Sequence, residues 1–175
     1  MHVQGHSTVR EGVVTGLLGA IVVAVWYFLI DTASGQPFHT PNVLGKIIFQ
    51  GDLTPAVHHV APGVVAGFTV LHLVVYILLG SLLALVTHIA MGNLALRMGV
   101  WIGLVCAFCL SAGLTYMLAI ATGERLPLWS VLGGSFLGVA VMGWYLLQRH
   151  PEVRDIGRPL GDEVDAPPHP GGGAI

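Results

Sequence analysis

The sequence is poor in charged residues, and long stretches of it have none. Only 9% of its 175 residues are Asp, Glu, Lys or Arg, whereas soluble globular domains carry about a quarter. The few basic residues are scattered and the formal net charge is −2, so no basic surface that could follow a phosphate backbone is expected. These absences argue against a soluble domain and against nucleic acid as a partner.

Catalytic signatures are also missing. The chain has no HExxH segment, no phosphate-binding glycine loop and no Ser/His/Asp order typical of hydrolases. Its only two cysteines, Cys106 and Cys109, lie in one apolar stretch and give no information about the redox compartment. We therefore predict that the protein is not an enzyme.

What the sequence does contain is four long apolar stretches without Lys, Arg, Asp or Glu. They cover residues 12–30, 62–90, 98–121 and 126–147. About 20 helical residues cross the hydrocarbon core of a bilayer, and each stretch approaches or exceeds that length. We predict an all-α polytopic membrane protein whose residues 1–150 form a four-helix transmembrane bundle. Residues 151–175 are rich in Pro, Gly and acidic residues, a composition that predicts a disordered cytoplasmic tail.

The distribution of basic residues between the spans predicts the orientation. Arg10, Arg97, Arg149, Arg154 and Arg158 lie on one side, and Lys46 and Arg125 lie on the other. Because basic loops are retained on the cytoplasmic side, both termini are predicted to be cytoplasmic.

The connection over residues 31–61 is the longest between two spans. Within it, Thr40 followed by Pro41 is typical of an N-cap and first helical residue, and predicts a short amphipathic helix toward Gln50 that lies at the membrane interface. Asp31, at the end of the first span, is expected to accept hydrogen bonds from the loop backbone and so to anchor the chain there.

The residues of this connection carry a resemblance. They follow the pattern D-x3-G-x-P-x2-T-P-x2-L-G, formed by Asp31, Gly35, Pro37, Thr40, Pro41, Leu44 and Gly45. This pattern after a first span rich in small residues resembles a group of uncharacterised short bacterial multi-pass membrane proteins. The resemblance covers about the first third of the chain, implies a bacterial inner membrane, and implies no activity.

Small residues recur every four positions within the spans and predict helix-packing faces. The candidates are Gly12, Gly16, Ala20, Gly63, Gly67, Gly99, Gly103, Gly134 and Gly138. Close backbone approach through such faces is a main cause of helix association in lipid. The faces serve either packing within the bundle or docking to another subunit.

His72 lies about ten residues into the second span, near the middle of the bilayer, where an ionisable residue is a functional candidate. Cys106 and Cys109 of the antiparallel third span are expected at a similar depth. The three residues could ligate a soft metal ion. The alternative is a hydrogen-bonded core histidine beside two cysteines that only fill space.

A haem site is the next possibility, because His72 and His88 share a span. Their spacing turns one side chain by about 160° from the other, and no other span supplies a facing histidine. Two stacked haems are therefore not expected unless a neighbouring chain completes the sites, and His88 is interpreted as an interfacial residue.

The external connection also contains groups that could converge on a divalent cation. They are Asp31, His39, Asp52, His58 and His59. The alternative is that these histidines are solvated at the interface.

Two functions remain open from the sequence. The favoured one is a non-catalytic accessory or scaffolding subunit of a larger bacterial membrane complex, of respiratory or photosynthetic type, because small-residue faces are abundant and polar chemistry in the spans is sparse. The alternative is a small transport protein or a protein that handles a metal or haem through His72, together with Tyr76 and the two cysteines.

Overall fold

The computed structural model describes residues 5–52, 59–91, 94–121 and 127–153, and this part of the chain consists of helices joined by turns and loops, without a strand. The helices are α1 (Gly5–Ala33), α2 (His39–Gln50), α3 (Pro62–Met91), α4 (Leu94–Ala121) and α5 (Leu128–Arg149), followed by a 3-10 turn, η1 (Pro151–Val153). Four of them are long and apolar enough to cross a membrane: Thr8–Ala33, Pro62–Met91, Leu96–Ile120 and Leu128–Arg149. The predicted all-α fold with four spans is confirmed, with boundaries shifted by a few residues.

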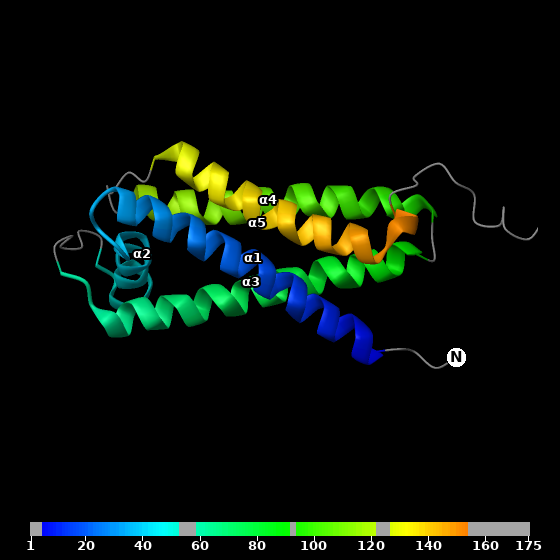
Figure 1. Cartoon of the computed structure of the whole chain (residues 1–175), viewed down its shortest axis with the longest axis horizontal. Coiled ribbons are helices and arrows are strands. Elements are labelled where there is room, and N and C mark those ends of the chain that lie inside the picture. Colours follow the sequence, from blue (N-terminus) through cyan, green and yellow to red (C-terminus); the bar gives the residue numbers. More distant parts are fainter. Residues whose placement is uncertain (1–4, 53–58, 92–93, 122–126, 154–175) are drawn as a thin grey trace, which may run out of the picture.

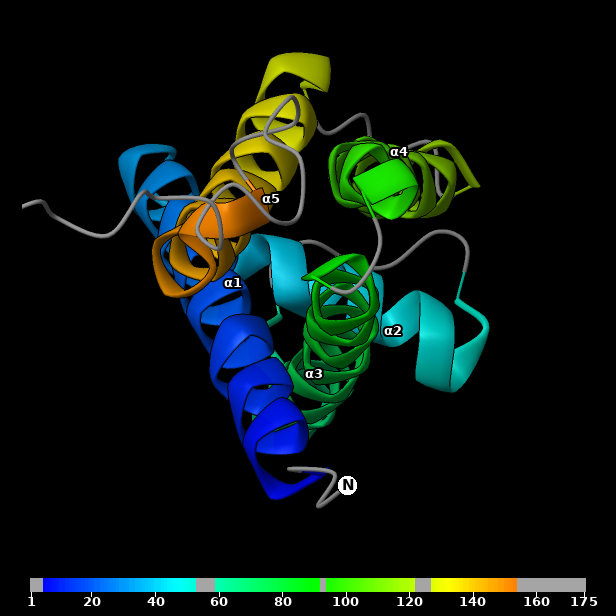
Figure 2. The same ribbon diagram turned by 90° about the vertical axis from the view of Figure 1, so that its right-hand side faces the viewer.

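The four long helices run along the long axis of the molecule, and α2 lies across one end of them (Figure 1). We call this the α2 end. Seen along the bundle from the opposite end, α1 and α5 lie on one side and α3 and α4 on the other (Figure 2). Packing follows the order α1, α3, α4, α5, and α1 closes the ring against α5.

Helices α1 and α3 approach most closely at glycines. A Cβ atom on Gly12 would lie 2.5 Å from Cα of Ser81, and one on Gly16 would lie 2.5 Å from Cα of Ile77. Gly80 faces the backbone of Gly16 in the same way. Because no side chain fits between the two backbones here, the glycines allow the contact that membrane helices use in place of hydrophobic burial. Ala20 continues this buried face of α1.

Helix α5 packs against α1 through a second set of glycines. Gly134 lies against the ring of Trp26, and Gly138 lies against Val23. The indole N–H of Trp26 donates a hydrogen bond to the carbonyl oxygen of Ser130 over 2.9 Å. Gly134 and Gly138 of α5 thus lie at the interface with α1, and a polar contact stabilises the same interface.

Two of the predicted packing glycines, in the second and third spans, make no helix contact within the described bundle. A Cβ atom on Gly63 or on Gly99 would meet no described atom within 4 Å. Gly63 lies in the first turn of α3, and Gly99 precedes the buried Val100 on α4 but faces away from the neighbouring helices. Docking to another subunit stays open for this face of α4. Gly103 makes only an ordinary contact with a leucine of α3, whereas Gly67 lies against Phe49 of α2.

Helix α2 begins at His39, which is earlier than its sequence signal predicts. Its N-cap is Phe38, in the left-handed conformation with φ 67°, and Thr40 lies inside the first turn. Thr40 is not the N-cap, because its backbone N–H donates a hydrogen bond to the carboxylate of Asp31 on α1. The group that caps the start of α2 therefore comes from another helix. The helix ends as predicted at Gln50, where Gly51 adopts φ 64°.

The start of the C-terminal segment departs from the predicted disordered tail. Residues 151–153 form η1, and the side chain of Val153 is fully buried against Ala90 and Val100. Burial of one apolar side chain against the ends of α3 and α4 orders this turn. Residues 154–175 of the predicted tail lie outside the described part of the chain.

Candidate functional site

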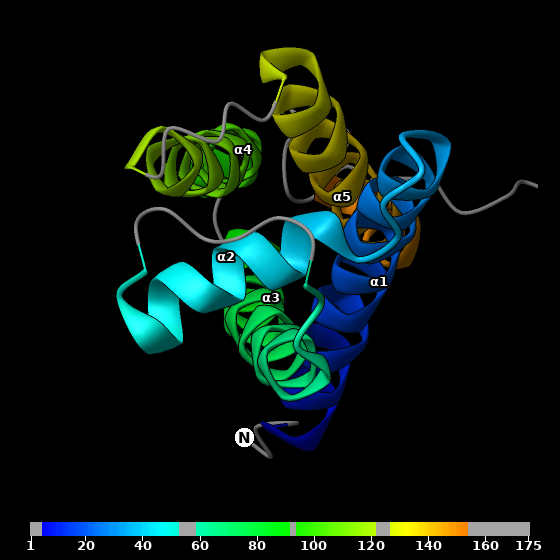
Figure 3. The same ribbon diagram turned by 90° about the vertical axis from the view of Figure 1, so that its left-hand side faces the viewer.

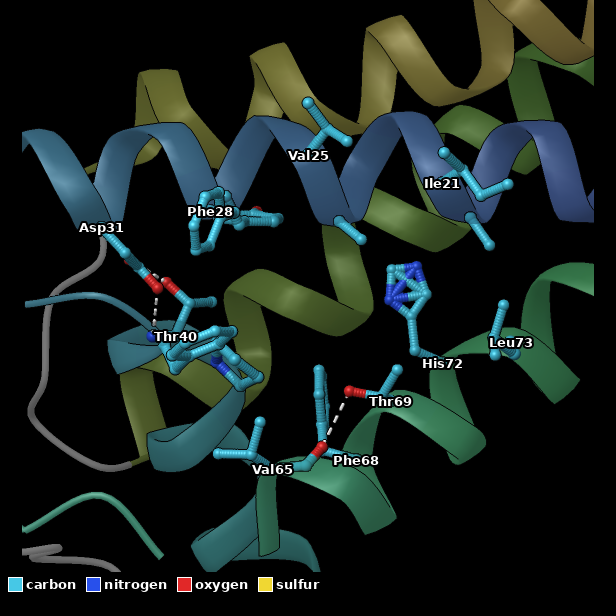
Figure 4. Close-up of a pocket in the computed structure, with 15 residues that line it drawn as sticks. Ile21, Val25, Phe28, Asp31, Thr40, Val65, Phe68, Thr69, His72 and Leu73 are labelled. Carbon is cyan, nitrogen blue, oxygen red and sulfur yellow. Dashed lines mark hydrogen bonds between the residues drawn. The ribbon is translucent and has the colours of Figure 1, made fainter. Parts of the chain in front are cut away.

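A cavity of about 470 Å³ lies between α1 and α3 at the α2 end. From their glycine contact the two helices diverge toward this end, and the start of α2 lies across the space between them (Figures 1 and 3). Phe28 of α1 and Phe68 and His72 of α3 extend into the cavity (Figure 4). Its walls are almost entirely apolar, so the few polar groups that border it are informative.

The contact between Asp31 and Thr40 forms the end of the cavity nearest α2 (Figure 4). Both residues are buried, and the Thr40 backbone N–H and side-chain hydroxyl each donate a hydrogen bond of 2.8 Å to the Asp31 carboxylate. The negative carboxylate also lies at the N-terminus of α2, where the helix dipole favours it. These are the anchoring hydrogen bonds expected for Asp31, and Pro41 beside them lines the same wall.

Asn42 and Lys46 of α2, which no sequence motif marks as site residues, form hydrogen bonds with the backbone just before α3. The Asn42 side chain accepts the Ala61 N–H over 3.0 Å and donates to the carbonyl oxygen of His59 over 3.1 Å. The ammonium of Lys46 also donates to this carbonyl, over 3.0 Å. An asparagine on an apolar short helix was the available signal, since a buried amide needs partners.

His72 lies at the wall of the cavity between two aromatic rings. It stacks on Tyr76 with centroids 4.7 Å apart and an interplanar angle of 30°, and meets Phe68 edge-on at 6.2 Å. Its Nε2 atom is buried and has no hydrogen-bond partner in the described residues. The hydroxyl of Tyr27, which borders the same cavity, is also buried without such a partner. Unpaired polar groups in an apolar medium are costly, so both atoms can gain from a ligand.

A second cavity of about 350 Å³ lies on the other side of this wall, between α3 and α4. It is bordered by a row of hydrogen-bonded hydroxyl groups: the Tyr76 hydroxyl is 2.8 Å from that of Ser111, and the Ser111 hydroxyl donates to that of Ser135 over 3.2 Å. These hydrogen bonds link α3, α4 and α5. Four residues border both cavities: Tyr27, Thr40, Phe68 and His72.

The predicted soft-metal site is not formed. Cys106 and Cys109 are exposed on α4, whereas His72 lies inward, and these three residues do not bring their ligand atoms together. Similar depth in antiparallel helices does not place side chains on facing surfaces, which explains the error. Among the described residues that line the cavity there is also no cation to pair with haem propionates, and the Asp31 carboxylate borders it instead, so this lining does not favour a haem.

The predicted loop cation site has no support in the described residues. Asp31 is engaged by Thr40, His59 is exposed, and His39 and Asp52 form no three-ligand group with them. His58 lies outside the described part of the chain.

Instead, the described residues bring three ligating groups together at the end opposite α2. Nε2 of His88 is 2.9 Å from one carboxylate oxygen of Glu11, and Nε2 of His150 is 2.8 Å from the other. The two imidazole rings meet nearly edge-on with centroids 4.9 Å apart. His88, predicted as an interfacial residue, thus contacts two residues, Glu11 and His150, that no sequence motif marks. An acidic residue just before an apolar run was the only local signal.

Comparison of the chain with protein-family models, with curated proteins and with solved structures gives no match. The assignment of function therefore rests on the chemistry of these sites.

Proposed function

We propose that this chain is a non-catalytic integral membrane protein that binds a neutral, lipid-soluble molecule in the cavity beside His72. The observation that carries the proposal is that two residues of one apolar cavity lining, His72 and Tyr27, each carry a buried polar atom, Nε2 and the hydroxyl, without a hydrogen-bond partner in the described chain. This corresponds to the cofactor-handling alternative of the sequence, with a lipophilic ligand in place of a metal or haem.

The lining supports a ligand that arrives from the bilayer. The volume falls in the range of about 300–1,000 Å³ that is usual for small-molecule sites. Ile21, Val25 and Phe28 border the cavity and are about half exposed, which opens it toward the surroundings of the bundle. Because the spans place this opening at lipid rather than water, an apolar chain or ring can enter without crossing a polar surface.

The polar atoms support a ligand with a hydrogen-bond acceptor. The Tyr27 hydroxyl is a donor, and Nε2 of His72 donates in one neutral tautomer. A carbonyl oxygen that reached either donor would satisfy it, whereas an anionic head group would be repelled by the Asp31 carboxylate that borders the same cavity. Quinones and other carbonyl-bearing isoprenoids are the ligand class that combines these properties.

The proposal can be tested with a benzoquinone that carries a decyl chain. Quenching of tryptophan fluorescence would be titrated on the full chain in mild detergent, for the wild type and for Tyr27→Phe, His72→Leu and Tyr116→Phe. A lost hydrogen bond is worth about 0.5–1.5 kcal/mol, so each cavity variant should weaken binding roughly two- to tenfold. Tyr116 lies on the exposed side of α4 away from the cavity, and its variant should bind like the wild type.

Mass spectrometry of a lipid extract from the purified protein gives a second measurement. A carbonyl-bearing lipid enriched over the whole membrane in the wild type, and lost in His72→Leu, would support the proposal with a ligand other than quinone. Non-saturable quenching together with no enriched lipid would contradict it, as would equal affinities in the Tyr27→Phe and Tyr116→Phe proteins.

The proposed setting is the bacterial inner membrane, with both termini in the cytoplasm and α2 at the external interface. Arg10, Arg97 and Arg149 lie at the end of the bundle opposite α2, which supports this orientation by the positive-inside rule. Reporter fusions would test it, since a cytoplasmically active reporter should work at both termini. A reporter active at only one terminus would contradict the orientation.

A second candidate function, the accessory subunit favoured by the sequence, rests on α4. Gly99, Cys106 and Gly113 recur at seven-residue intervals, and the two glycines meet no described side chain or backbone within 4 Å. Such a face suits close approach of a transmembrane helix from a larger membrane complex. Native electrophoresis should show a larger assembly that Gly113→Leu dissociates and that Val70→Leu, on the exposed side of α3, leaves intact. A single small species for all three proteins would exclude it.

A further inference from the structure

We propose that Glu11, His88 and His150 form a binding site for a divalent transition-metal ion of the zinc class, at the end of the bundle opposite the cavity. Three separate parts of the chain supply the ligands: the first turns of α1, the last turn of α3 and the residue that follows α5. This inference is independent of the lipophilic ligand proposed above.

The geometry is close to that of a three-ligand metal site. One ligand atom from each of the three residues can be chosen so that all lie within 4.8 Å of one another. Metal bonds of about 2.0–2.1 Å in a tetrahedron place neighbouring ligand atoms about 3.3 Å apart. The two observed nitrogen–oxygen separations, 2.9 and 2.8 Å, run to different oxygens of the Glu11 carboxylate. For one of these oxygens to face both imidazoles across an ion, the carboxylate has to turn within a group whose ligand atoms already lie inside 4.8 Å.

The ligand types select the metal class. Two imidazoles and one carboxylate suit zinc and its neighbours in the first transition row, whereas calcium and magnesium take all-oxygen sets. The carboxylate supplies one negative charge toward the ion. In the hydrogen-bonded form each Nε2 carries the proton that it donates to Glu11; on coordination that proton is carried on Nδ1 instead, which frees the Nε2 lone pair without loss of a proton from the ring.

The positions of the three ligands are fixed by packing around them. The Glu11 and His150 side chains are each 13% exposed and that of His88 is 22% exposed, so water has limited access. The tight contact of Gly12 on α3 sets the distance between the helices that carry Glu11 and His88. Burial of Val153 directly beyond His150 holds the end of α5 against α3 and α4. Ligands on such rigid elements favour a preformed site.

The site predicts that metal joins the ends of α1, α3 and α5. A bound ion would restrain the relative movement of the three helices, and binding to the folded protein alone would raise its melting temperature. Glu11, His88 and His150 would therefore hold the ends of the three helices together more strongly with a bound ion than with their hydrogen bonds alone.

The test uses the full chain in detergent, purified with an affinity tag that contains no histidine and stripped of metal with a chelator that is then removed. Co²⁺ is titrated alone and followed by its visible absorption, and Zn²⁺ is then added to displace it. We expect one Co²⁺ per chain. Glu11→Gln and His88→Gln should each weaken binding by at least about tenfold, because loss even of groups that only support metal ligands costs 10- to 100-fold. His59→Gln, an exposed histidine at the other end, should bind like the wild type.

The melting temperature with and without Zn²⁺ gives a readout on the wild type that does not require the variants to fold. A rise with Zn²⁺ that is lost in Glu11→Gln supports the site. No stoichiometric Co²⁺ binding and no Zn²⁺-dependent shift in the wild type would overturn it, as would Co²⁺ binding that Glu11→Gln and His88→Gln leave unchanged.

Discussion

The contact between α1 and α3 allows a sharp test of how this bundle is held together. The perturbation is Gly16→Ala, the addition of one methyl group on the face of α1 that meets α3. That methyl would lie 2.5 Å from Cα of Ile77, about 1 Å short of an ordinary contact. Because the obstructing atoms belong to the backbone, no side-chain rotation can relieve the overlap, and the two helices have to separate.

The magnitude follows from that separation. A gap of about 0.5–1 Å forfeits a quarter to a half of the dispersion attraction between the atoms that part, and overpacking of a close-packed interior costs about 1–3 kcal/mol. Gly16→Ala should therefore reduce the free energy of unfolding by about 2–3 kcal/mol, at the upper part of this range. Gly99→Ala is the matched control, since its methyl would meet nothing within 4 Å in the described chain, and it should leave stability unchanged or raise it by up to about 1 kcal/mol through helix propensity.

The assay is reversible unfolding in mixed micelles at increasing fractions of SDS, followed by circular dichroism and tryptophan fluorescence. Both probes should give the same transition for each variant. Equal stability of Gly16→Ala and Gly99→Ala would refute the reasoning, because it would mean that the backbones of α1 and α3 are not in contact.

Two further predictions concern single hydrogen bonds and use the same assay. Thr40→Val removes a donor to the buried Asp31 carboxylate and should lower the free energy of unfolding by about 1–3 kcal/mol. Thr69→Val is the control, because the exposed Thr69 hydroxyl bonds within its own helix, and it should be nearly neutral. Equal effects of the two substitutions would contradict a role for the Asp31 contact. Trp26→Phe removes the hydrogen bond to the Ser130 carbonyl and should lower the free energy of unfolding by at least about 0.5–1.5 kcal/mol. Trp144→Phe, at an exposed ring, is the control. Equal stability of the two variants would contradict the packing of α5 on α1.

The spans could be predicted because their cause is local. A run such as residues 62–90 carries its own evidence in its length and in its lack of charge. The end of α2 was also predictable, since Gly51 follows its last residue. Its start was not, because the capping carboxylate of Asp31 belongs to a different helix, and the chain direction between them had to be known first.

The sites depended on information that the linear sequence does not contain. Glu11 lies 77 residues from His88 and 139 residues from His150, so only the packing of α1 against α3 and α5 brings the three together. The helical rotation of α4 was equally decisive. Cys106 was expected near His72 from its depth along the span, but α4 is rotated about its axis so that the thiol faces outward. Membrane depth can be counted along a helix, whereas the direction of a side chain depends on its neighbours.

The shared wall between the two cavities limits what the protein can hold. Because Tyr27, Thr40, Phe68 and His72 bound both spaces, a change in their rotamers that widens one compartment narrows the other. A ligand that displaced these side chains from the α1 side would therefore oppose a ligand on the α4 side.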